Sequence, residues 1–225
     1  HMFYTDFDLP LVKECLWFGL KSIAPSLFHQ TNQLIQIYLL VSYLPGYAFI
    51  LGLFSIAEMI SSTLGTFRFK ISSTASEAYN NNKLALIQDY QIRSYQWMSI
   101  SMGYLVVILV VGAPLLGIIA GSEFVLAVPM IIVLTIGRVA EQPGSINADL
   151  FLGCNKPEYY LYSNFMEFIF RGLLLYLGLA FFQWSWFALA AARIAGWWVR
   201  WFLGIWLIDK NLFKFQMNWW QAVIA

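Results

Sequence analysis

The stretch VLAVPMIIVLTIGRVAEQPGSINADLFL, residues 125–152, decides the fold. A helix of about 20 apolar residues crosses the roughly 30 Å hydrocarbon core of a bilayer, and this stretch is long enough to do so. It nevertheless contains Arg138, Glu141 and Asp149. Each such charge costs about 2.5–3.5 kcal/mol at the centre of a membrane helix. These three side chains are therefore expected to face protein or water rather than lipid.

The composition of the whole chain agrees with a membrane protein. Of its 225 residues, 60% are hydrophobic and 11% are charged, whereas a soluble domain has about 45–50% apolar and about 25% charged residues. Too few polar residues remain to cover the surface of a soluble globule. The same figures exclude a disordered chain, a collagen-like repeat and a disulfide-stapled secreted module. We therefore expect an all-α, polytopic membrane protein.

Apolar runs separated by short connections predict six transmembrane helices. They cover residues 16–41, 47–67, 96–119, 125–152, 159–182 and 184–208. The one long connection, residues 68–95, is polar and is expected to form two short cytoplasmic surface helices joined by a turn at Asn80, Asn81 and Asn82. Residues 1–15 are expected to be a tag remnant and an interfacial segment, 16–212 the six-helix bundle, and 213–225 a cytoplasmic tail.

Lysine and arginine are distributed unequally between the two sides of these spans. If the N-terminus is cytoplasmic, every lysine and arginine outside the spans lies on the cytoplasmic side. The three outer connections contain no lysine and no arginine. This asymmetry predicts a multi-pass protein of the cell membrane with both termini in the cytoplasm.

The first predicted span has a polar face. Its hydroxyl, imidazole and amide side chains are Ser22, Ser26, His29, Gln33 and Gln36, and the face is widened by Gln30 and Asn32. Their spacing places them on one side of a helix. Two interpretations remain open: the side chains hydrogen-bond to neighbouring helices, or they line a water-filled cavity.

Charged residues in two other spans suggest local ion pairs. Arg138 and Glu141 have i,i+3 spacing, so Arg138 is either neutralised by Glu141 or free to meet an anionic ligand. Glu167 and Arg171 have i,i+4 spacing, which favours an intrahelical ion pair. Pro143, followed by a glycine, is expected to kink the helix that contains it.

The remaining charges within predicted spans have no partner in their own helix. Arg193 needs an acid from another helix, a lipid phosphate or a bound anion, and Arg200 either reaches the cytoplasmic interface or binds a ligand. Glu58 is a candidate proton or cation site, with pairing to Arg138, Arg171 or Arg193 as the alternative. It lies in a stripe of small residues expected to permit close helix contact: Gly52, Ser55, Ser62 and Gly65.

Catalytic and metal-binding patterns are absent from the sequence. It contains no HExxH, GxSxG, Walker A or Rossmann motif, and Cys15 and Cys154 are separated by most of the chain. We therefore expect a protein that is not an enzyme, with no metal, cofactor or catalytic residue. The formal net charge of +1 gives no indication of a nucleic-acid partner.

Four stretches together resemble a known family. They are LWFGLKSIAPSLFHQTNQLIQIYLL (16–40), GYAFILGLFSIAEMISSTLG (46–65), SEAYNNNKLALIQDYQIRSYQW (76–97) and LFLGCNKPEYYLYSN (150–164). Their pattern and loop lengths are similar to one six-helix half of a polysaccharide or O-antigen flippase of the multidrug/oligosaccharidyl-lipid/polysaccharide exporter superfamily. A proline often found in the family near residues 66–70 is missing here.

The resemblance implies a transporter that moves a lipid-linked sugar across the membrane by alternating access. Family members have about twelve helices in two halves around a central, often cationic cavity, so this chain is expected to pair with a second half or a second copy. Three arginines would attract the pyrophosphate of the substrate: Arg138, Arg171 and Arg193. Five side chains of the first span would bind sugar hydroxyls: His29, Gln30, Asn32, Gln33 and Gln36.

Three other functions remain open. An ion-coupled drug exporter of the same superfamily would use Glu58 or Asp149 as its coupling acid. A membrane-embedded glycan ligase or polymerase would need an extracellular catalytic loop, and the predicted outer connections are only a few residues long. A non-transporting assembly subunit would have all its intramembrane charges paired and buried.

Overall fold

The computed structural model describes residues 9–63, 70–115, 118, 121–184 and 186–214, and it contains no β-strand within these ranges. The α-helices are α1 (Leu9–Tyr43), α2 (Tyr47–Ser62), α3 (Ser72–Asn80), α4 (Leu84–Gly112), α6 (Val128–Gly153), α7 (Pro157–Ala180) and α8 (Trp186–Asn211). Short 3-10 helices, η2 (Ala113–Leu115) and η3 (Ser122–Ala127), lie between α4 and α6. The predicted all-α class is confirmed.

The predicted apolar segments coincide with helices, but one predicted boundary is wrong. The turn after α3 forms as expected, and Asn82 adopts a φ of 54°, a left-handed conformation that asparagine tolerates. From Leu84, however, α4 continues without a break to Gly112. The second surface helix and the third predicted span are therefore one helix. Residues 9–15 of the expected interfacial segment form the start of α1, whereas residues 1–8 and most of the expected tail lie outside the described residues.

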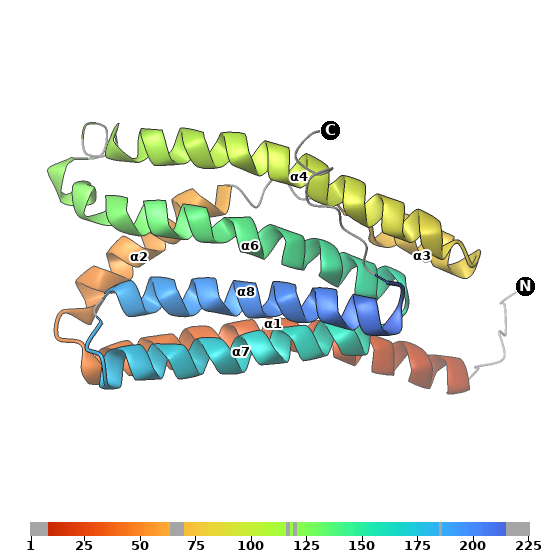
Figure 1. Ribbon diagram of the computed structural model, residues 1–225. Coiled ribbons are helices and arrows are strands. Elements are labelled where there is room, and N and C mark those ends of the chain that lie inside the picture. The colour runs from red at the N-terminus through yellow and green to blue at the C-terminus, as the bar shows by residue number, and fades with distance from the viewer. Residues whose placement is uncertain (1–8, 64–69, 116–117, 119–120, 185, 215–225) are drawn as a thin grey trace, which may run out of the picture.

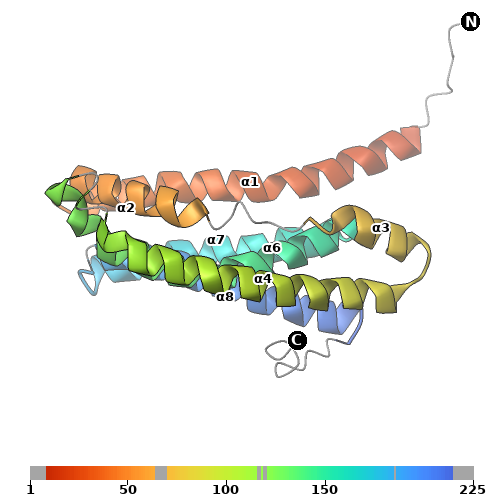
Figure 2. The same cartoon turned by 90° about the horizontal axis from the view of Figure 1, so that it is seen from above.

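Helix α6 is the centre of the bundle. It contacts α2, α3, α4, α7 and α8, and Figure 1 shows α4, α6, α8 and α7 side by side in that order. Because it has neighbours on several sides, 16 of its 26 residues are buried. Helix α1 packs mainly against α7, and in Figure 2 α1 and α2 lie together along one side of the molecule.

Two apolar cores hold the helices together. The first contains Phe54, Leu134 and Trp197 and joins α1, α2, α6, α7 and α8. The second contains Ile87, Ile146 and Phe151 and joins α3, α4, α6 and α8. On α6 the first core ends at Ala140 and the second begins at Ile146. The segment between these positions carries the polar residues of the helix centre.

Helix contacts at small residues differ from the predicted ones. Gly204 of α8 touches α6, where an added Cβ would lie 2.7 Å from Asn147 Nδ2. Gly52 and Ser55 do not form the predicted close helix contact with any described residue: a Cβ at Gly52 would have no neighbour within 4 Å, and Ser55 is exposed. Gly65, the last residue of that stripe, lies outside the described residues.

The two cysteines lie in different environments. Cys15 on α1 is exposed, whereas Cys154, directly after α6, is fully buried in the second core. Burial raises the pKa of the Cys154 thiol to about 11, because the thiolate would lose its hydration. Cys154 is therefore an unreactive thiol in the folded chain.

Hydropathy identifies two membrane-spanning candidates among the described helices. The stretches Leu84–Leu115 and Phe124–Gly153 are long and apolar enough to cross a bilayer, and α2 is apolar but shorter. Helices α1, α7 and α8 have 35, 24 and 26 residues, which exceeds the roughly 20 needed. These three helices are long enough, but they are not among the candidates that hydropathy selects.

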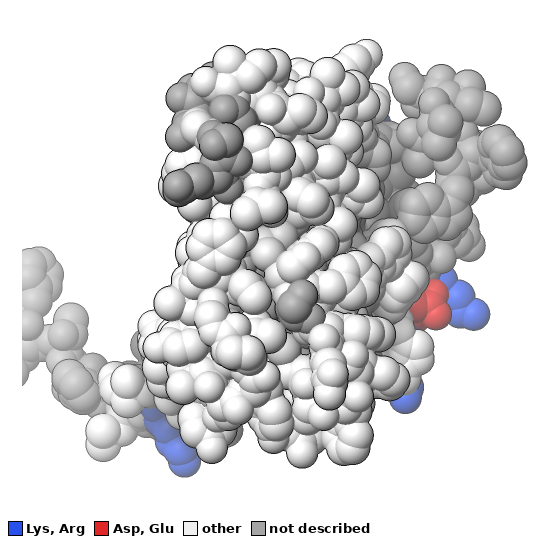
Figure 3. Space-filling model, turned by 90° about the vertical axis from the view of Figure 1, so that its left-hand side faces the viewer, with Lys and Arg blue, Asp and Glu red and all other residues white. Residues whose placement is uncertain are grey.

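One end of the bundle is almost free of charge. Figure 3 views the end at which α1 turns into α2 and α7 into α8, and no coloured atom lies on its central face. The blue and red atoms in this view lie at its margins, farther from the viewer. This end carries the connections that were predicted to lie outside the cell, which contain Glu123 but no lysine or arginine.

Candidate functional site

Charged side chains from four helices meet near the middle of the bundle. Arg138 is the eleventh of 26 residues in α6, and Glu167 is the eleventh of 24 in α7. The group, called the polar layer below, consists of Glu58, Arg138, Glu141, Glu167, Arg171, Arg193 and Arg200. It brings together all three arginines predicted to attract an anion, and Glu58 with them.

Three ion pairs neutralise most of the polar layer. Arg138 pairs with Glu141 within α6, and Arg193 of α8 pairs with Glu58 of α2. The third pair joins Arg200 Nη1 to Glu167 Oε2 at 2.9 Å and connects α8 to α7. Three of the open alternatives are thereby decided: Arg138 has its i,i+3 partner, Arg193 takes its acid from another helix, and Glu58 is paired with an arginine.

The predicted intrahelical pair between Glu167 and Arg171 is wrong. Glu167 instead pairs with Arg200, because α7 and α8 pack closely along their length. Arg200 also donates from Nη2 to the Glu141 carbonyl at 3.3 Å. It therefore lies inside the bundle and does not extend to an interface.

Trp197 lies close to two of the arginines. The guanidinium carbon of Arg138 lies 4.8 Å from the centre of a Trp197 ring, and that of Arg193 lies 5.6 Å from it. A tryptophan ring attracts cations through the negative face of its π system. The buried indole thus stabilises two positive charges of the polar layer.

Arg171 differs from the other arginines of the layer. It is 3% exposed and donates one hydrogen bond, from Nη2 to Gln36 Oε1 of α1 at 3.1 Å. No carboxylate of the described residues forms an ion pair with it. Since the layer contains four arginines and three glutamates, Arg171 carries its excess positive charge.

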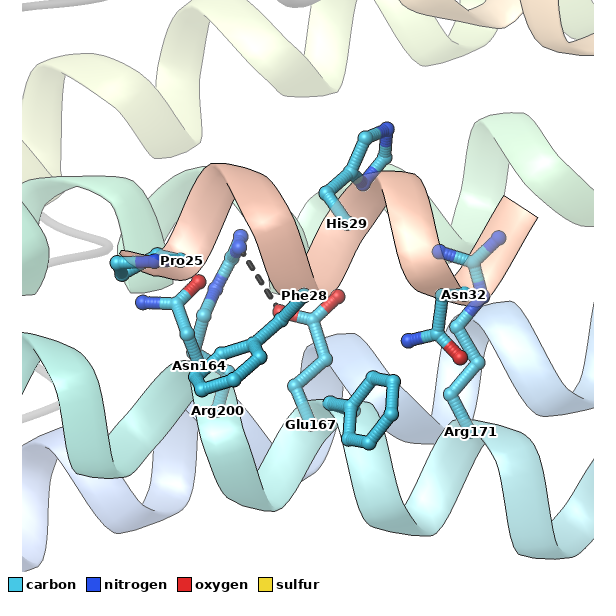
Figure 4. Close-up of a pocket in the computed structure, with 9 residues that line it drawn as sticks. Pro25, Phe28, His29, Asn32, Asn164, Glu167, Arg171 and Arg200 are labelled. Atoms are coloured by element: carbon cyan, nitrogen blue, oxygen red, sulfur yellow. Dashed lines mark ion pairs between the residues drawn. The ribbon is translucent and has the colours of Figure 1, made fainter. Parts of the chain in front are cut away.

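A small cavity lies beside Arg171, between α1, α7 and α8. Its volume is about 40 Å³, room for a few water molecules at roughly 10–15 Å³ each. The lining residues are Pro25, Phe28, His29, Asn32, Asn164, Glu167, Phe168, Arg171 and Arg200. In Figure 4 the ion pair between Arg200 and Glu167 lies at one side, and the Arg171 guanidinium lies next to Asn32 at the other.

The polar face of α1 is divided between the interior and the surface. Asn32 and Gln36 are buried, whereas His29, Gln30 and Gln33 are exposed in this chain. Gln33 Nε2 lies 3.2 Å from His29 Nε2, within hydrogen-bond distance. The five predicted sugar-binding residues therefore do not share one cavity: two face α7 and three form an outward polar patch, called the α1 patch below.

Several buried polar atoms of the layer lack a hydrogen-bond partner among the described residues. They are Arg138 Nε, Arg193 Nε and Arg200 Nε, and Gln142 Oε1 next to the layer on α6 likewise has no partner. Buried polar groups in proteins are normally satisfied by protein or by ordered water. The chemistry of the layer therefore fits bound water or a polar ligand better than a dry interior.

Asp149 does not belong to this layer. It is buried on α6, eight residues beyond Glu141, which is about 12 Å along a helix axis. The described residues also contain no group of three histidine, cysteine or acidic side chains able to hold a metal ion.

Sequence reasoning missed Asn164 and two phenylalanines of the cavity wall. Asn164, Glu167 and Arg171 lie at offsets 0, 3 and 7, so one polar face of α7 was present as a signal. Phe28 and Phe168 gave no comparable signal, because a phenylalanine in a membrane helix usually only packs. No protein-family model matches this chain, and neither a curated protein nor a solved structure matches it significantly.

Proposed function

We propose that the chain is one half of a flippase-type membrane transporter that moves a lipid-linked oligosaccharide or polysaccharide precursor by alternating access. In this proposal six segments cross the cell membrane, both ends of the chain lie in the cytoplasm, and a second half or second copy covers α1. The flippase-like pattern of the sequence is one support. The geometry of the polar layer and of the α1 patch supplies the others.

The observation that supports the proposal most strongly is the exposure of the α1 patch. His29, Gln30 and Gln33 are exposed at the middle of a 35-residue helix whose neighbouring exposed residues include Leu27, Leu34 and Tyr38. Apart from the contact between Gln33 and His29, hydrocarbon in a bilayer would leave the donors and acceptors of these amide and imidazole groups without hydrogen bonds, at several kcal/mol per group. A hydrated path between this chain and a second half satisfies them, and sugar hydroxyls are suitable partners for amides.

The charge of the polar layer supports an anionic substrate. Its excess cation, Arg171, reaches α1 and bonds Gln36 on the buried side of the same helix. The cavity of about 40 Å³ is too small for a sugar. The substrate path is therefore placed along the open side of α1, with Arg171 behind it as a source of positive potential for a pyrophosphate.

A non-transporting assembly subunit is the second candidate. It is favoured by the pairing of all three glutamates of the layer with arginines. The two functions predict different results in a transport assay, because an assembly subunit by itself moves no lipid.

Flipping by purified chain in liposomes tests the proposal. The substrate is a fluorescent polyprenyl-pyrophosphate-linked oligosaccharide, and a membrane-impermeant reductant reports the fraction left in the outer leaflet. We expect Arg171→Gln to reduce the flipping rate about 10- to 100-fold, because the positive potential that Arg171 supplies raises the local concentration of an anionic substrate by factors of this order.

Arg93→Gln is the matched control. Arg93 pairs with Asp89 at an exposed position on α4, where its side chain is 69% exposed. The flipping rate of this variant should stay within about twofold of the original. A rate in Arg171→Gln equal to that of the control, or a wild-type rate equal to that of protein-free liposomes, would overturn the proposal.

A further inference from the structure

We propose that the cavity beside Arg171 binds a small monovalent anion of the size of chloride when no substrate is present. This inference concerns the resting chain and goes beyond the flipping of lipids. It stands on three features of the cavity: its net charge, its free donors and its size.

The charge of the cavity wall requires a counter-charge. Among the nine lining residues, Arg171 and Arg200 are cationic and Glu167 is anionic. Glu167 is engaged by Arg200, so one positive charge remains on a side chain that is 97% buried. A buried charge without a partner is strongly unfavourable in a low-dielectric interior. One monovalent anion restores neutrality, whereas a divalent anion would reverse the excess.

Donors for an anion converge on the same space. A guanidinium has five N–H donors, and Arg171 donates one hydrogen bond within the described residues. Asn32 of α1 lies next to the Arg171 guanidinium and lines the cavity with it, whereas Asn164 of α7 lies at the other side beside Arg200 and donates to the Tyr160 carbonyl at 2.7 Å (Figure 4). Donors thus come from two helices, and their positions are fixed by the packing of α1 against α7.

The size of the cavity selects among anions. A space of about 40 Å³ holds a few waters, or a halide with one or two waters. A pyrophosphate or a carboxylate sugar acid such as gluconate does not fit into it. Chloride therefore meets the requirements of charge, donors and volume together.

Thermal unfolding of the detergent-solubilised full chain tests the proposal. Unfolding is followed by tryptophan fluorescence in sodium chloride and in sodium gluconate of equal ionic strength. Chloride is expected to raise Tm along a saturable curve, by about 5–10 °C once its concentration is about 100 times Kd. Bromide should act similarly, and gluconate should have no saturable effect.

Arg171→Gln removes the charge while keeping a polar side chain. Its Tm should be the same in chloride and in gluconate, whereas Arg93→Gln should retain the wild-type response. Equal Tm values of wild type in the two salts would overturn the proposal even if the variant did not fold. Stabilisation by phosphate or pyrophosphate but not by chloride would also overturn it. A chloride response with no flipping activity would refute only the proposed transport function.

Discussion

Replacing Glu167 by glutamine is expected to lower the free energy of unfolding by about 3–5 kcal/mol, which is the usual effect of removing one partner of a buried ion pair. The Glu167 and Arg200 side chains are 11% and 16% exposed. Without the carboxylate, Arg200 would face Arg171 across a small cavity, with no anion of the protein between them. Denaturation of the solubilised chain, followed by tryptophan fluorescence, measures the change.

Two further variants test whether the loss of stability comes from the buried ion pair between Glu167 and Arg200. Glu158→Gln breaks a looser pair with Lys21, at 3.7 Å with side chains 33% and 24% exposed, and should change the unfolding free energy by less than about 1 kcal/mol. The double variant Glu167→Gln with Arg200→Gln removes both charges and should recover more than half of the loss. If Glu167→Gln is as stable as Glu158→Gln, the pair between α7 and α8 does not stabilise the bundle.

Replacing Glu58 by glutamine is expected to lower the free energy of unfolding by about 2–4 kcal/mol. Its partner Arg193 is 6% exposed and would remain charged beside Trp197. The expected loss is smaller than for Glu167, because the Glu58 side chain is 28% exposed and the pair is therefore less completely buried.

Asp89→Asn is the control for this second prediction. It breaks an exposed ion pair with Arg93 on α4 and should change the unfolding free energy by less than about 1 kcal/mol. A loss in Glu58→Gln that does not exceed this control would show that Arg193 is stabilised by Trp197 and water without needing the acid.

Local sequence patterns were sufficient for the helices but not for all their ends. Long apolar runs predicted where helices form, because helix formation depends on neighbouring residues along the chain. The run from Leu84 to Gly112 was divided at residue 96 on polarity alone. Its polar first half packs on α3 and α6 through Ile87 and Tyr95. Because this packing stabilises the helical conformation on both sides of residue 96, the helix continues through it.

The pairing of charges could not be predicted from spacing within one helix. An i,i+4 pair between Glu167 and Arg171 is worth only about 0.2–0.5 kcal/mol, which is less than a buried pair can gain from close packing. Contact between α7 and α8 places Arg200 next to Glu167, and this contact is a property of the tertiary fold. The division of the α1 polar face into buried and exposed parts likewise depends on where α7 packs.

The central claim is that the α1 patch borders a hydrated path and not lipid. Labelling of two adjacent single-cysteine variants tests this claim most directly. Gln33→Cys and Leu34→Cys are made in a Cys15→Ser chain; Leu34 is 68% exposed and Cys154 is buried and unreactive. Membranes containing each variant are treated with a charged, water-soluble maleimide. We predict that the cysteine at 33 reacts through a hydrated path while the cysteine at 34, facing lipid, does not. Equal labelling at both positions, whether complete or absent, would contradict the account.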